Sequence, residues 1–277
     1  MKIAVITNYS RKNASKVSKN TFDFLSRCNA ELYAPYEDIK KLSYVNYLEE
    51  DDLFKTADIF IVIGGDGTII HNAKKAAMFD KPVLGINAGR VGFLAGLEPD
   101  EIEKLSLLFK EKYPVEKRML LEVELNGKKY YALNDAVVSK GNVFRMIDIE
   151  VQIGSESLAY RADGLIAATP TGSSAYSLSA GGPMVDSRLE SIMLTPISPQ
   201  SLYARPIILK PDEKIIVSAA SPSGTDVYLT VDGEESFPVS EEDKVVIKKS
   251  ANMYVKLIKL NEGSFLTALS KKFNLLG

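Results

Sequence analysis

The chain has 277 residues, enough for about two domains of ordinary size. Its content of 45% apolar and 25% charged residues is typical of a globular protein, and its formal net charge of −2 disfavours nonspecific binding to nucleic acid or to membranes. A single cysteine, Cys28, cannot form an internal disulfide, and a single histidine, His71, cannot build a zinc cluster. Zinc hydrolases and Ser-His-Asp hydrolases are therefore disfavoured.

The apolar runs of the sequence are far too short to cross a bilayer, Ile59–Ile63 being one of the longest. The N-terminus leads directly into a predicted strand, Lys2–Ile6, and not into a signal peptide. We therefore expect a cytoplasmic protein that binds neither nucleic acid nor membranes.

Strands alternate with helices over the first 113 residues. The predicted strands are 2–7, 31–34, 57–63 and 81–86, and the predicted helices are 12–28, 69–78 and 99–112. A further short helix is expected within 35–57, ending at the acidic run Glu49–Asp52. This alternation predicts an α/β N-terminal domain over residues 1–113, built on a doubly wound, mostly parallel sheet. In such sheets, ligands bind beyond the carboxyl ends of the strands.

After Pro114 the pattern becomes mainly β. Leu120–Leu125 alternates with period two, meets the hairpin signal Asn126-Gly127, and is expected to pair with the strand that follows. The other predicted strands are 128–133, 147–153, 157–161, 214–220, 226–231 and 244–248. We predict a mainly β, sandwich-like domain over residues 114–258. The tail has helical spacing over 264–276, and we expect residues 259–277 to pack back on the first domain.

The segment Gly64-Gly65-Asp66-Gly67-Thr68 joins a buried strand to a helix. Three glycines in four positions let the backbone turn sharply and approach a ligand closely. The first turn of the helix offers unpaired N–H groups and a positive dipole end, which suit a phosphate. Asp66 does not suit a phosphate unless it holds a metal or accepts a proton, so it is a candidate for chemistry. The alternative is a plain tight turn with Asp66 as the helix N-cap.

Three other stretches have ligand-binding character. A second glycine loop, 87–93, follows the strand 81–86, and Asn134-Asp135 follows a predicted strand with an amide and a carboxylate. Residues 162–183 contain six Ser and Thr residues between Thr169 and Ser179, without an apolar stripe. Small hydroxyl side chains allow close approach and supply hydrogen bonds to sugars, phosphates or amides. The alternative is a Ser-rich surface loop.

Taken in order, these motifs resemble the NAD kinase family. The resemblance rests on the Gly-Gly-Asp-Gly-Thr loop, Asn87-x-Gly-x-x-Gly-Phe93, Asn134-Asp135, Asp163-Gly164, the run Thr169–Pro183 and the segment Pro196–Pro206. Gly-Gly-Asp-Gly alone is shared with diacylglycerol-type lipid kinases, whereas the Thr-Pro-Thr-Gly-Ser run is much more specific. The resemblance covers residues 58–235.

The resemblance implies transfer of a phosphoryl group from ATP to the 2′-hydroxyl of the adenosine ribose of NAD, giving NADP. Asp66 would be the proton acceptor, and a divalent metal, Mg²⁺, would neutralise phosphate charge. Gly67 would leave room for the ribose, and His71 would lie near the phosphates unless it is an exposed helix residue. The phosphate loop would comprise Gly64, Gly65, Gly67 and Thr68. No metal ligand is assigned among the protein side chains.

The remaining substrate contacts are also implied by the resemblance. Asn134 and Asp135 would bind the adenine or its ribose, although the family more often has Glu at the second position. The other implied contacts are Arg145, Arg161, Asp163, Ser174, Ala175, Tyr176, Ser177, Leu178, Ser179, Ser198 and Glu234. Ser174 and Glu234 stand where the family usually has Thr and Gln. Phe93 would either stack on a base or belong to the core.

The resemblance also implies a homodimer or homotetramer with sites shared across subunits. Two other functions stay open at this point, a diacylglycerol-type lipid kinase and a non-catalytic NAD-binding protein. Polyphosphate stays an alternative to ATP as the phosphoryl donor, because no Walker-type lysine motif marks the donor pocket.

Overall fold

The computed structural model describes residues 1–38, 42–88, 92–110, 112–141, 145–222, 224–261 and 265–273. The chain divides into two compact units, residues 1–117 with 254–277 and residues 118–253. The boundaries between the units fall within two strands, β6 (Val115–Leu125) and β17 (Val245–Ile258). Each unit is described by itself below.

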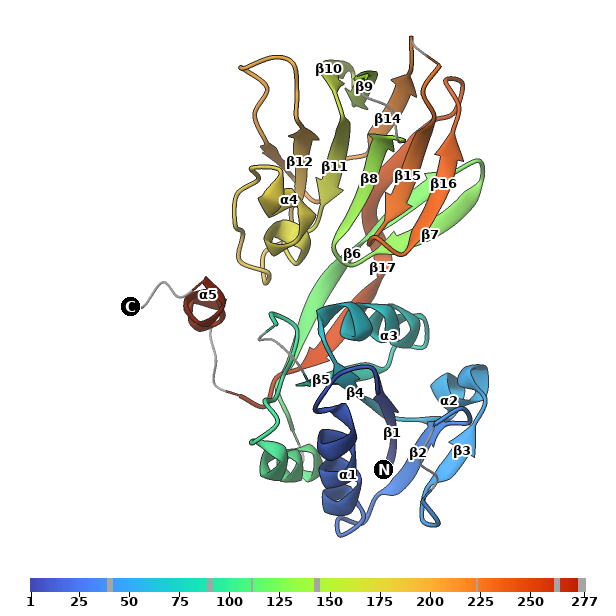
Figure 1. Ribbon diagram of the computed structural model, residues 1–277, viewed down its shortest axis with the longest axis vertical. Coiled ribbons are helices and arrows are strands. Elements are labelled where there is room, and N and C mark those ends of the chain that lie inside the picture. Colours follow the sequence, from blue (N-terminus) through green and yellow to red (C-terminus); the bar gives the residue numbers. More distant parts are fainter. Residues whose placement is uncertain are drawn as a thin grey trace. The chain divides into compact units, whose positions relative to one another are not determined.

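The first unit is built on a parallel sheet in the order β17-β5-β4-β1-β2-β3. Its strands are β1 (Lys2–Thr7), β2 (Glu31–Pro35), β3 (Asn46–Leu48), β4 (Ile59–Gly64), β5 (Pro82–Asn87) and the end of β17. Its helices are α1 (Ala14–Leu25), α2 (Glu50–Thr56), α3 (Asp66–Met78) and the 3₁₀ helix η1 (Ile102–Phe109). Figure 1 labels the strands and the helices α1, α2 and α3, and α1 and α3 lie beside β1 and β4.

All six residues of the central strand β4 are buried, because helices cover both faces of the sheet. Ile61 and Ile63 pack in the core cluster that includes residues of α1 and η1. On the alternate face Phe60 stacks on Phe54 of α2, with the ring centroids 4.5 Å apart, and α3 packs on β4 and β5. The predicted doubly wound α/β domain is confirmed.

Two helix predictions need correction. The acidic run does not end a helix, because Glu50, Asp51 and Asp52 form the first turn of α2, where negative side chains suit the positive end of the helix dipole. The helix expected over 99–112 is the shorter 3₁₀ helix η1. Its buried residues Ile102, Leu105 and Leu108 recur every three residues, which matches the three residues per turn of a 3₁₀ helix.

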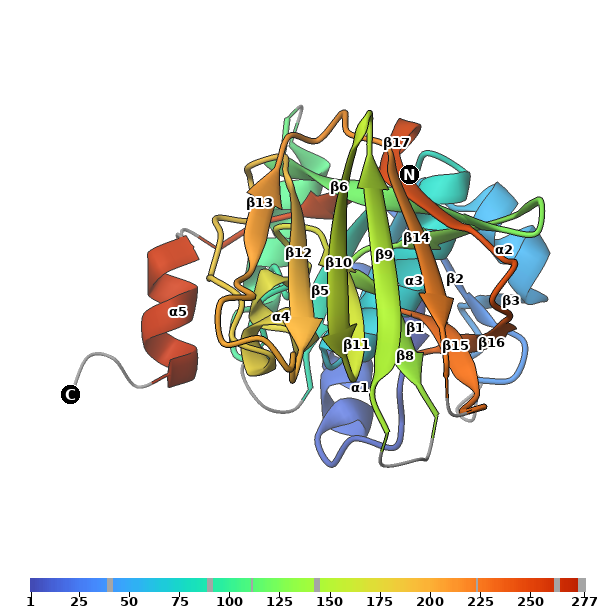
Figure 2. The same ribbon diagram turned by 90° about the horizontal axis from the view of Figure 1, so that it is seen from above.

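The second unit contains two antiparallel sheets (Figures 1 and 2). One has the order β13-β12-β11-β8-β15-β16, with β8 (Asp135–Lys140), β11 (Gly164–Ala168), β12 (Ile192–Ile197), β13 (Ile207–Leu209), β15 (Val227–Val231) and β16 (Glu235–Val239). The other comprises β10 (Glu156–Ala162), β9 (Ile147–Ile153), β14 (Ile215–Ala220), β17, β6 and β7 (Lys128–Ala132). The sheets face each other, since β10 contacts β12 and β9 contacts β11. The predicted sandwich is confirmed.

The turns of this unit follow their sequence signals. Asn126 and Gly127 both have positive φ, 52° and 75°, as a two-residue hairpin between β6 and β7 requires. Gly154, with φ of 59°, lies in the turn between β9 and β10, which pair as a hairpin. The short helices η2 (Gly172–Ser174) and α4 (Tyr176–Ser179) lie in the hydroxyl-rich run.

The predicted C-terminal helix is present as α5 (Phe265–Phe273), and residues 274–277 lie outside the described part of the chain. The packing of the tail on the first domain stays a prediction. Residues 89–91 of the second glycine loop also lie outside the described residues.

Candidate active site

Asp66 occupies the first helical position of α3, immediately beyond the buried strand β4. The N-cap of α3 is Gly65, so the interpretation of Asp66 as an N-cap is wrong. Its carboxylate instead accepts two backbone hydrogen bonds, from Phe93 N to Oδ2 at 3.1 Å and from Leu94 N to Oδ1 at 3.2 Å. A carboxylate has about four acceptor sites, so these bonds fix the orientation of Asp66 and leave acceptor capacity on both oxygens.

The glycines around Asp66 have different steric surroundings. A Cβ atom at Gly92 would lie 2.2 Å from Asp66 Oδ1, and one at Gly64 would lie 2.7 Å from Cβ of Thr68, so both positions require glycine. A Cβ at Gly67 would have no neighbour within 4 Å. The first turn of α3 is therefore packed closely on one side and open at Gly67, as expected of a helix start that receives a ligand.

The turn between β1 and α1 packs against the same loop. Asn8 Nδ2 donates to Thr68 Oγ1 at 2.9 Å, and the Asn8 backbone N–H donates to Ile63 O. The Arg11 side chain crosses Gly65, where a Cβ atom would lie 3.5 Å from Arg11 Nη2. Arg11 is exposed, and no acidic side chain in the described part of the chain pairs with it. The Arg11 guanidinium group therefore lies beside the N-terminus of α3, the positive end of the helix dipole.

Sequence reasoning missed Arg11. It lies in an unremarkable turn more than 50 residues before the phosphate loop, and only the parallel pairing of β1 with β4 brings the ends of these two strands together. The one usable signal was the rule that ligands bind beyond the carboxyl ends of parallel strands, because residues 8–11 directly follow β1.

In the second unit, Asn134 and Asp135 are held by Asp232. Asp232 Oδ1 accepts from Asn134 N at 2.7 Å and from Asp135 N at 3.1 Å, and Oδ2 accepts from Leu133 N at 2.9 Å. Asp232 has φ of 50° and Gly233 has φ of 69°, and they are the first two residues of the three-residue turn that joins β15 to β16. Asp232 was not among the predicted site residues, although Asp-Gly between two strands is a recognisable turn signal.

The hydroxyl-rich run is more strongly structural than its composition indicates. Thr169, Ser173 and Ser177 are buried. Thr169 donates to Leu133 O, Ser173 donates to Pro170 O, and Ser177 bonds Thr195 at 2.9 Å. The Ser177 hydroxyl is thus engaged in a hydrogen bond within the protein. The exposed or half-buried predicted contacts in this run are Ser174, Ala175, Tyr176, Leu178 and Ser179.

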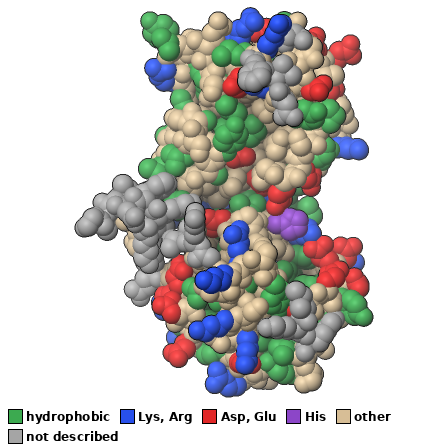
Figure 3. Space-filling model, in the orientation of Figure 1, with side chains coloured by type: hydrophobic (Ala, Val, Ile, Leu, Met, Phe, Trp, Pro, Cys, Tyr) green, Lys and Arg blue, Asp and Glu red, His purple; other side chains and the backbone are tan. Residues whose placement is uncertain are grey.

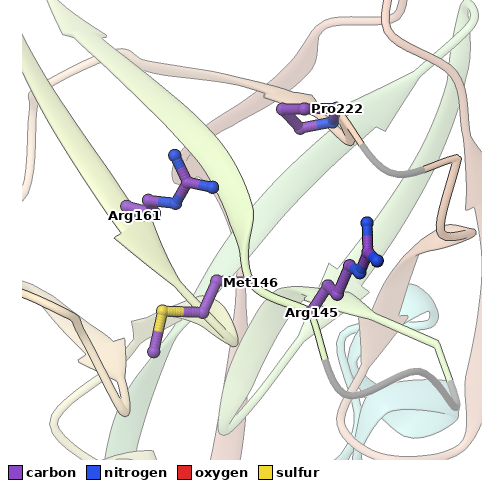
Figure 4. A pocket seen from close by; sticks show the side chains of 4 residues that line it. All are labelled: Arg145, Met146, Arg161 and Pro222. Atoms are coloured by element: carbon purple, nitrogen blue, oxygen red, sulfur yellow. The ribbon is translucent and has the colours of Figure 1, made fainter.

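Arg145 and Arg161 line one pocket together with Met146 and Pro222 (Figure 4). Both arginines are exposed, and Arg161 Nη1 lies 3.8 Å from Asp148 Oδ1, an exposed and therefore weak ion pair. The structure thus brings together two predicted substrate-binding cations that lie 16 residues apart in the sequence.

The other predicted site residues are placed as follows. Asp163 forms an ion pair with Lys140, its Oδ1 lying 2.6 Å from Lys140 Nζ. His71 is exposed on α3 and is the purple side chain in Figure 3. Phe93 is half-buried, Ser198 is exposed with φ of 45°, and Glu234 is exposed just beyond the Asp232-Gly233 turn.

Comparisons with known proteins decide the family. The family models for the ATP-NAD kinase N-terminal domain and the ATP-NAD kinase C-terminal domain match residues 3–113 and 133–260. The NAD kinase of Heliobacterium modesticaldum is 38% identical over 277 residues, with 98% of this chain and 97% of the relative covered. This chain belongs to the NAD kinase family. Another member, from Natranaerobius thermophilus, is 35% identical over 278 residues, which cover 98% of this chain and 96% of the relative.

Solved structures of NAD kinase relatives have the same fold. The match to the structure of yeast NADH kinase complexed with NADH covers all of this chain and 88% of the yeast chain, with a TM-score of 0.85 and 25% identity. An NAD kinase from Archaeoglobus fulgidus in complex with ATP matches all of this chain and 98% of its own, with a TM-score of 0.74 and 27% identity.

Two features are absent from the described residues of this NAD kinase family member. No group of three or more His, Cys, Asp or Glu side chains there is arranged to hold a metal ion. No helix there has both the length and the apolar character needed to cross a membrane.

We predict that Gly92→Ala abolishes most of the activity while the chain stays folded. The new methyl group would lie 2.2 Å from Asp66 Oδ1, which is too close, so the carboxylate must turn away from Phe93 N and Leu94 N. We expect turnover to fall by about 10²-fold, the usual cost of misplacing a reacting group by about 1 Å. The measurement is kcat, with thermal unfolding as the check on folding.

Gly141→Ala is the control for the Gly92 variant. Its added methyl group would meet a ring carbon of Tyr228 at 3.2 Å, a milder crowding in the other unit. Turnover should stay close to that of the unchanged protein. A Gly92→Ala variant with full kcat would contradict the tight packing of Gly92 on Asp66.

We predict that Asp232→Asn destabilises the protein by about 1–3 kcal/mol, the cost of leaving a buried backbone N–H without its acceptor. Asparagine tolerates the left-handed backbone at this position, but its amide NH₂ cannot accept one of the three N–H bonds that the carboxylate accepts. Denaturant unfolding measures the loss. Asp212→Asn, at an exposed turn, is the control, and an equal shift in both variants would contradict the prediction.

Proposed function

We propose that this chain is an NAD kinase that transfers the γ-phosphoryl group of ATP to the 2′-hydroxyl of the adenosine ribose of NAD. The observation that carries the proposal is the Asp66 carboxylate, which is oriented by two backbone N–H groups at the open first turn of a phosphate-loop helix. Membership of the NAD kinase family supplies the substrates. The lipid-kinase and non-catalytic alternatives are not favoured by that membership.

Asp66 is the proposed proton acceptor. As the 2′-oxygen attacks the γ-phosphorus, its proton passes to a carboxylate oxygen of Asp66. The new bond joins the 2′-oxygen to phosphorus, and the bond from the γ-phosphorus to the bridging oxygen of ADP breaks. Phosphoryl transfer depends mainly on positioning and charge stabilisation. A carboxylate held by two hydrogen bonds suits this role, because it presents a free acceptor site in a fixed direction.

The donor phosphates would lie at the first turn of α3. The unpaired N–H groups there and the helix dipole favour anions, and the Gly67 position is open. Arg11, beside Gly65, adds a full positive charge to the same loop. Mg²⁺ usually binds through substrate phosphates with one or two carboxylates. We therefore propose that the metal is carried mainly by ATP, where it supplies further charge neutralisation.

NAD would be bound chiefly by residues of the second unit. Asn134 supplies an amide and Asp135 a carboxylate, on a backbone that Asp232 holds in place. Amide and carboxylate groups match the donors and acceptors of adenine and its ribose. The pocket cations Arg145 and Arg161 suit the phosphates of NAD. Further proposed contacts are Gly67, His71, Phe93, Asp163, Ser174, Ala175, Tyr176, Leu178, Ser179, Ser198 and Glu234. Ser177 is left out of this set because its side chain is buried and bonds Thr195.

A homodimer or homotetramer with shared sites remains part of the proposal. Its support is the exposure of Arg145 and Arg161, since charged ligand-binding side chains at the surface can serve a neighbouring subunit. Polyphosphate remains an alternative donor. Arg11 suits phosphate charge of either donor, and none of the side chains at the loop, Asp66, Thr68 and Arg11, is a group that distinguishes a base.

The test of the proposed function is NADP formation by the purified protein with NAD, ATP and Mg²⁺, followed with an NADP-specific dehydrogenase. We expect a signal that is lost when NAD or the metal is omitted. NADP formation with polyphosphate but not with ATP would identify polyphosphate as the donor. No NADP formation with either donor would overturn the proposal.

We predict that Asp66→Asn lowers turnover by several orders of magnitude and leaves NAD binding largely intact. Asparagine keeps the size of the side chain and one hydrogen-bond acceptor, but it cannot take the 2′-hydroxyl proton. The measurements are kcat and NAD binding by calorimetry. Asp51→Asn, in the exposed first turn of α2, is the matched control. Near-normal turnover of the Asp66 variant would show that Asp66 is not the base.

A further inference from the structure

Lys259 directly follows β17 and reaches the segment that holds Asp66. Its Nζ donates to three successive backbone carbonyls, to Phe93 O at 3.3 Å, Leu94 O at 3.1 Å and Ala95 O at 2.9 Å. An ammonium group carries three N–H donors, which match these three acceptors in number. The Lys259 side chain therefore clamps residues 93–95 with charge-assisted hydrogen bonds.

The opposite side of this clamped segment faces Asp66. Phe93 N and Leu94 N are the donors to the Asp66 carboxylate. The peptide unit between Phe93 and Leu94 makes both kinds of bond, because its carbonyl accepts from Lys259 and its N–H donates to Asp66 Oδ1. A single peptide group thus links the ammonium to the carboxylate, and hydrogen bonds in such a chain polarise and strengthen one another.

The backbone at Lys259 is itself fixed to the first unit. Lys259 N donates to Pro114 O at 3.1 Å, and the preceding residues Lys256 and Leu257 pair with β5. Gly96 packs directly on Ile258, where a Cβ atom would lie 2.2 Å from the Ile258 carbonyl oxygen. The clamp therefore starts from a strand end with little freedom to move.

Segment 92–95 needs an external clamp because it belongs to neither a helix nor a strand. Its backbone groups have no regular ladder to hold them, so side chains supply the partners. The segment also packs closely on the carboxylate, since Gly92 leaves no space for a methyl group beside Asp66 Oδ1. A small displacement of the segment would therefore turn the Asp66 carboxylate.

We propose that Lys259 is a positioning residue for Asp66, which acts through the backbone of residues 93–95 and contacts no substrate. This inference rests on the proposed function of Asp66 as proton acceptor. A clamp that orients the base affects the chemical step and leaves the binding of NAD and ATP nearly unchanged.

The test compares Lys259→Met with Lys256→Met. Methionine keeps much of the length of the lysine side chain and removes its donors. Lys256 is the matched control because it lies at the same strand end but pairs with Asp80, its Nζ 2.6 Å from Asp80 Oδ1. We expect Lys259→Met to lower kcat by about 10- to 100-fold, with less than about a 3-fold change in KM for NAD and for ATP. Lys256→Met should keep the normal kcat, and Lys259→Arg should recover part of the activity.

Two further measurements separate positioning from a purely structural role. Hydrogen exchange of the Phe93 and Leu94 amides should become faster in Lys259→Met than in Lys256→Met. In an Asp66→Asn background, Lys259→Met should cause no further loss of the residual turnover, because no carboxylate is left to orient. Full additivity of the two substitutions, or equal losses of kcat in both lysine variants, would overturn the inference.

The inference and the proposed function fail in different ways. An unchanged protein that makes no NADP with ATP or polyphosphate would overturn the proposed function, and the role of Lys259 with it. An active unchanged protein together with a fully active Lys259→Met variant would overturn the role of Lys259 alone.

Discussion

The hydrogen bonds between Asp66 and the backbone of residues 93 and 94 are the interaction on which the first unit's site depends. They join the start of α3 to a segment that lies 27 and 28 residues further along the chain. That segment has neither helical nor strand hydrogen bonds. The carboxylate satisfies two of its N–H groups, and the Lys259 ammonium satisfies three of its carbonyls. Polar side chains thus replace the ladder that regular structure would supply.

The second unit uses the same device. The Asp232 carboxylate accepts three successive N–H groups at residues 133–135, immediately where β8 begins. Because the carboxylate is part of a tight hairpin, its own position is fixed by the pairing of β15 with β16. In both units, therefore, a carboxylate next to glycine orders an irregular segment that carries proposed ligand-binding residues. The two carboxylates differ in their surroundings. Asp66 lies at an open helix start, whereas Asp232 lies in a turn and holds the backbone of residues 133–135.

The fold was largely predictable because its main signals are local. Apolar β-branched runs predict the buried strand β4, and Asn126-Gly127 predicts the hairpin between β6 and β7. The two wrong helix predictions concerned signals that are ambiguous in one dimension. An acidic run can stand at either end of a short helix until the helix dipole is considered, and apolar residues three apart fit both a 3₁₀ and an α-helix.

The site was predictable only where a motif is contiguous in the sequence. The Gly-Gly-Asp-Gly-Thr loop identified Asp66, but no local motif indicated Arg11 or Lys259, and Asp232-Gly233 indicated only a turn. Lys259 lies about 165 residues from its three acceptors, and those acceptors are backbone carbonyls, which every residue possesses. Serines have the opposite difficulty. The hydroxyl-rich run looked uniformly suited to ligands, yet burial assigns Ser173 and Ser177 to internal hydrogen bonds.

An acid in a phosphate loop poses an electrostatic problem, because a carboxylate repels the donor phosphates that it must approach. The structure offsets this repulsion locally. The α3 dipole and Arg11 place positive potential at the loop, and Lys259 acts on the carboxylate through one polarised peptide group. The two N–H bonds also use acceptor sites on one side of Asp66, so the remaining sites have a defined direction. A carboxylate arranged in this way can accept a hydroxyl proton beside an anionic donor, which an unsupported aspartate at a helix start could not do as effectively.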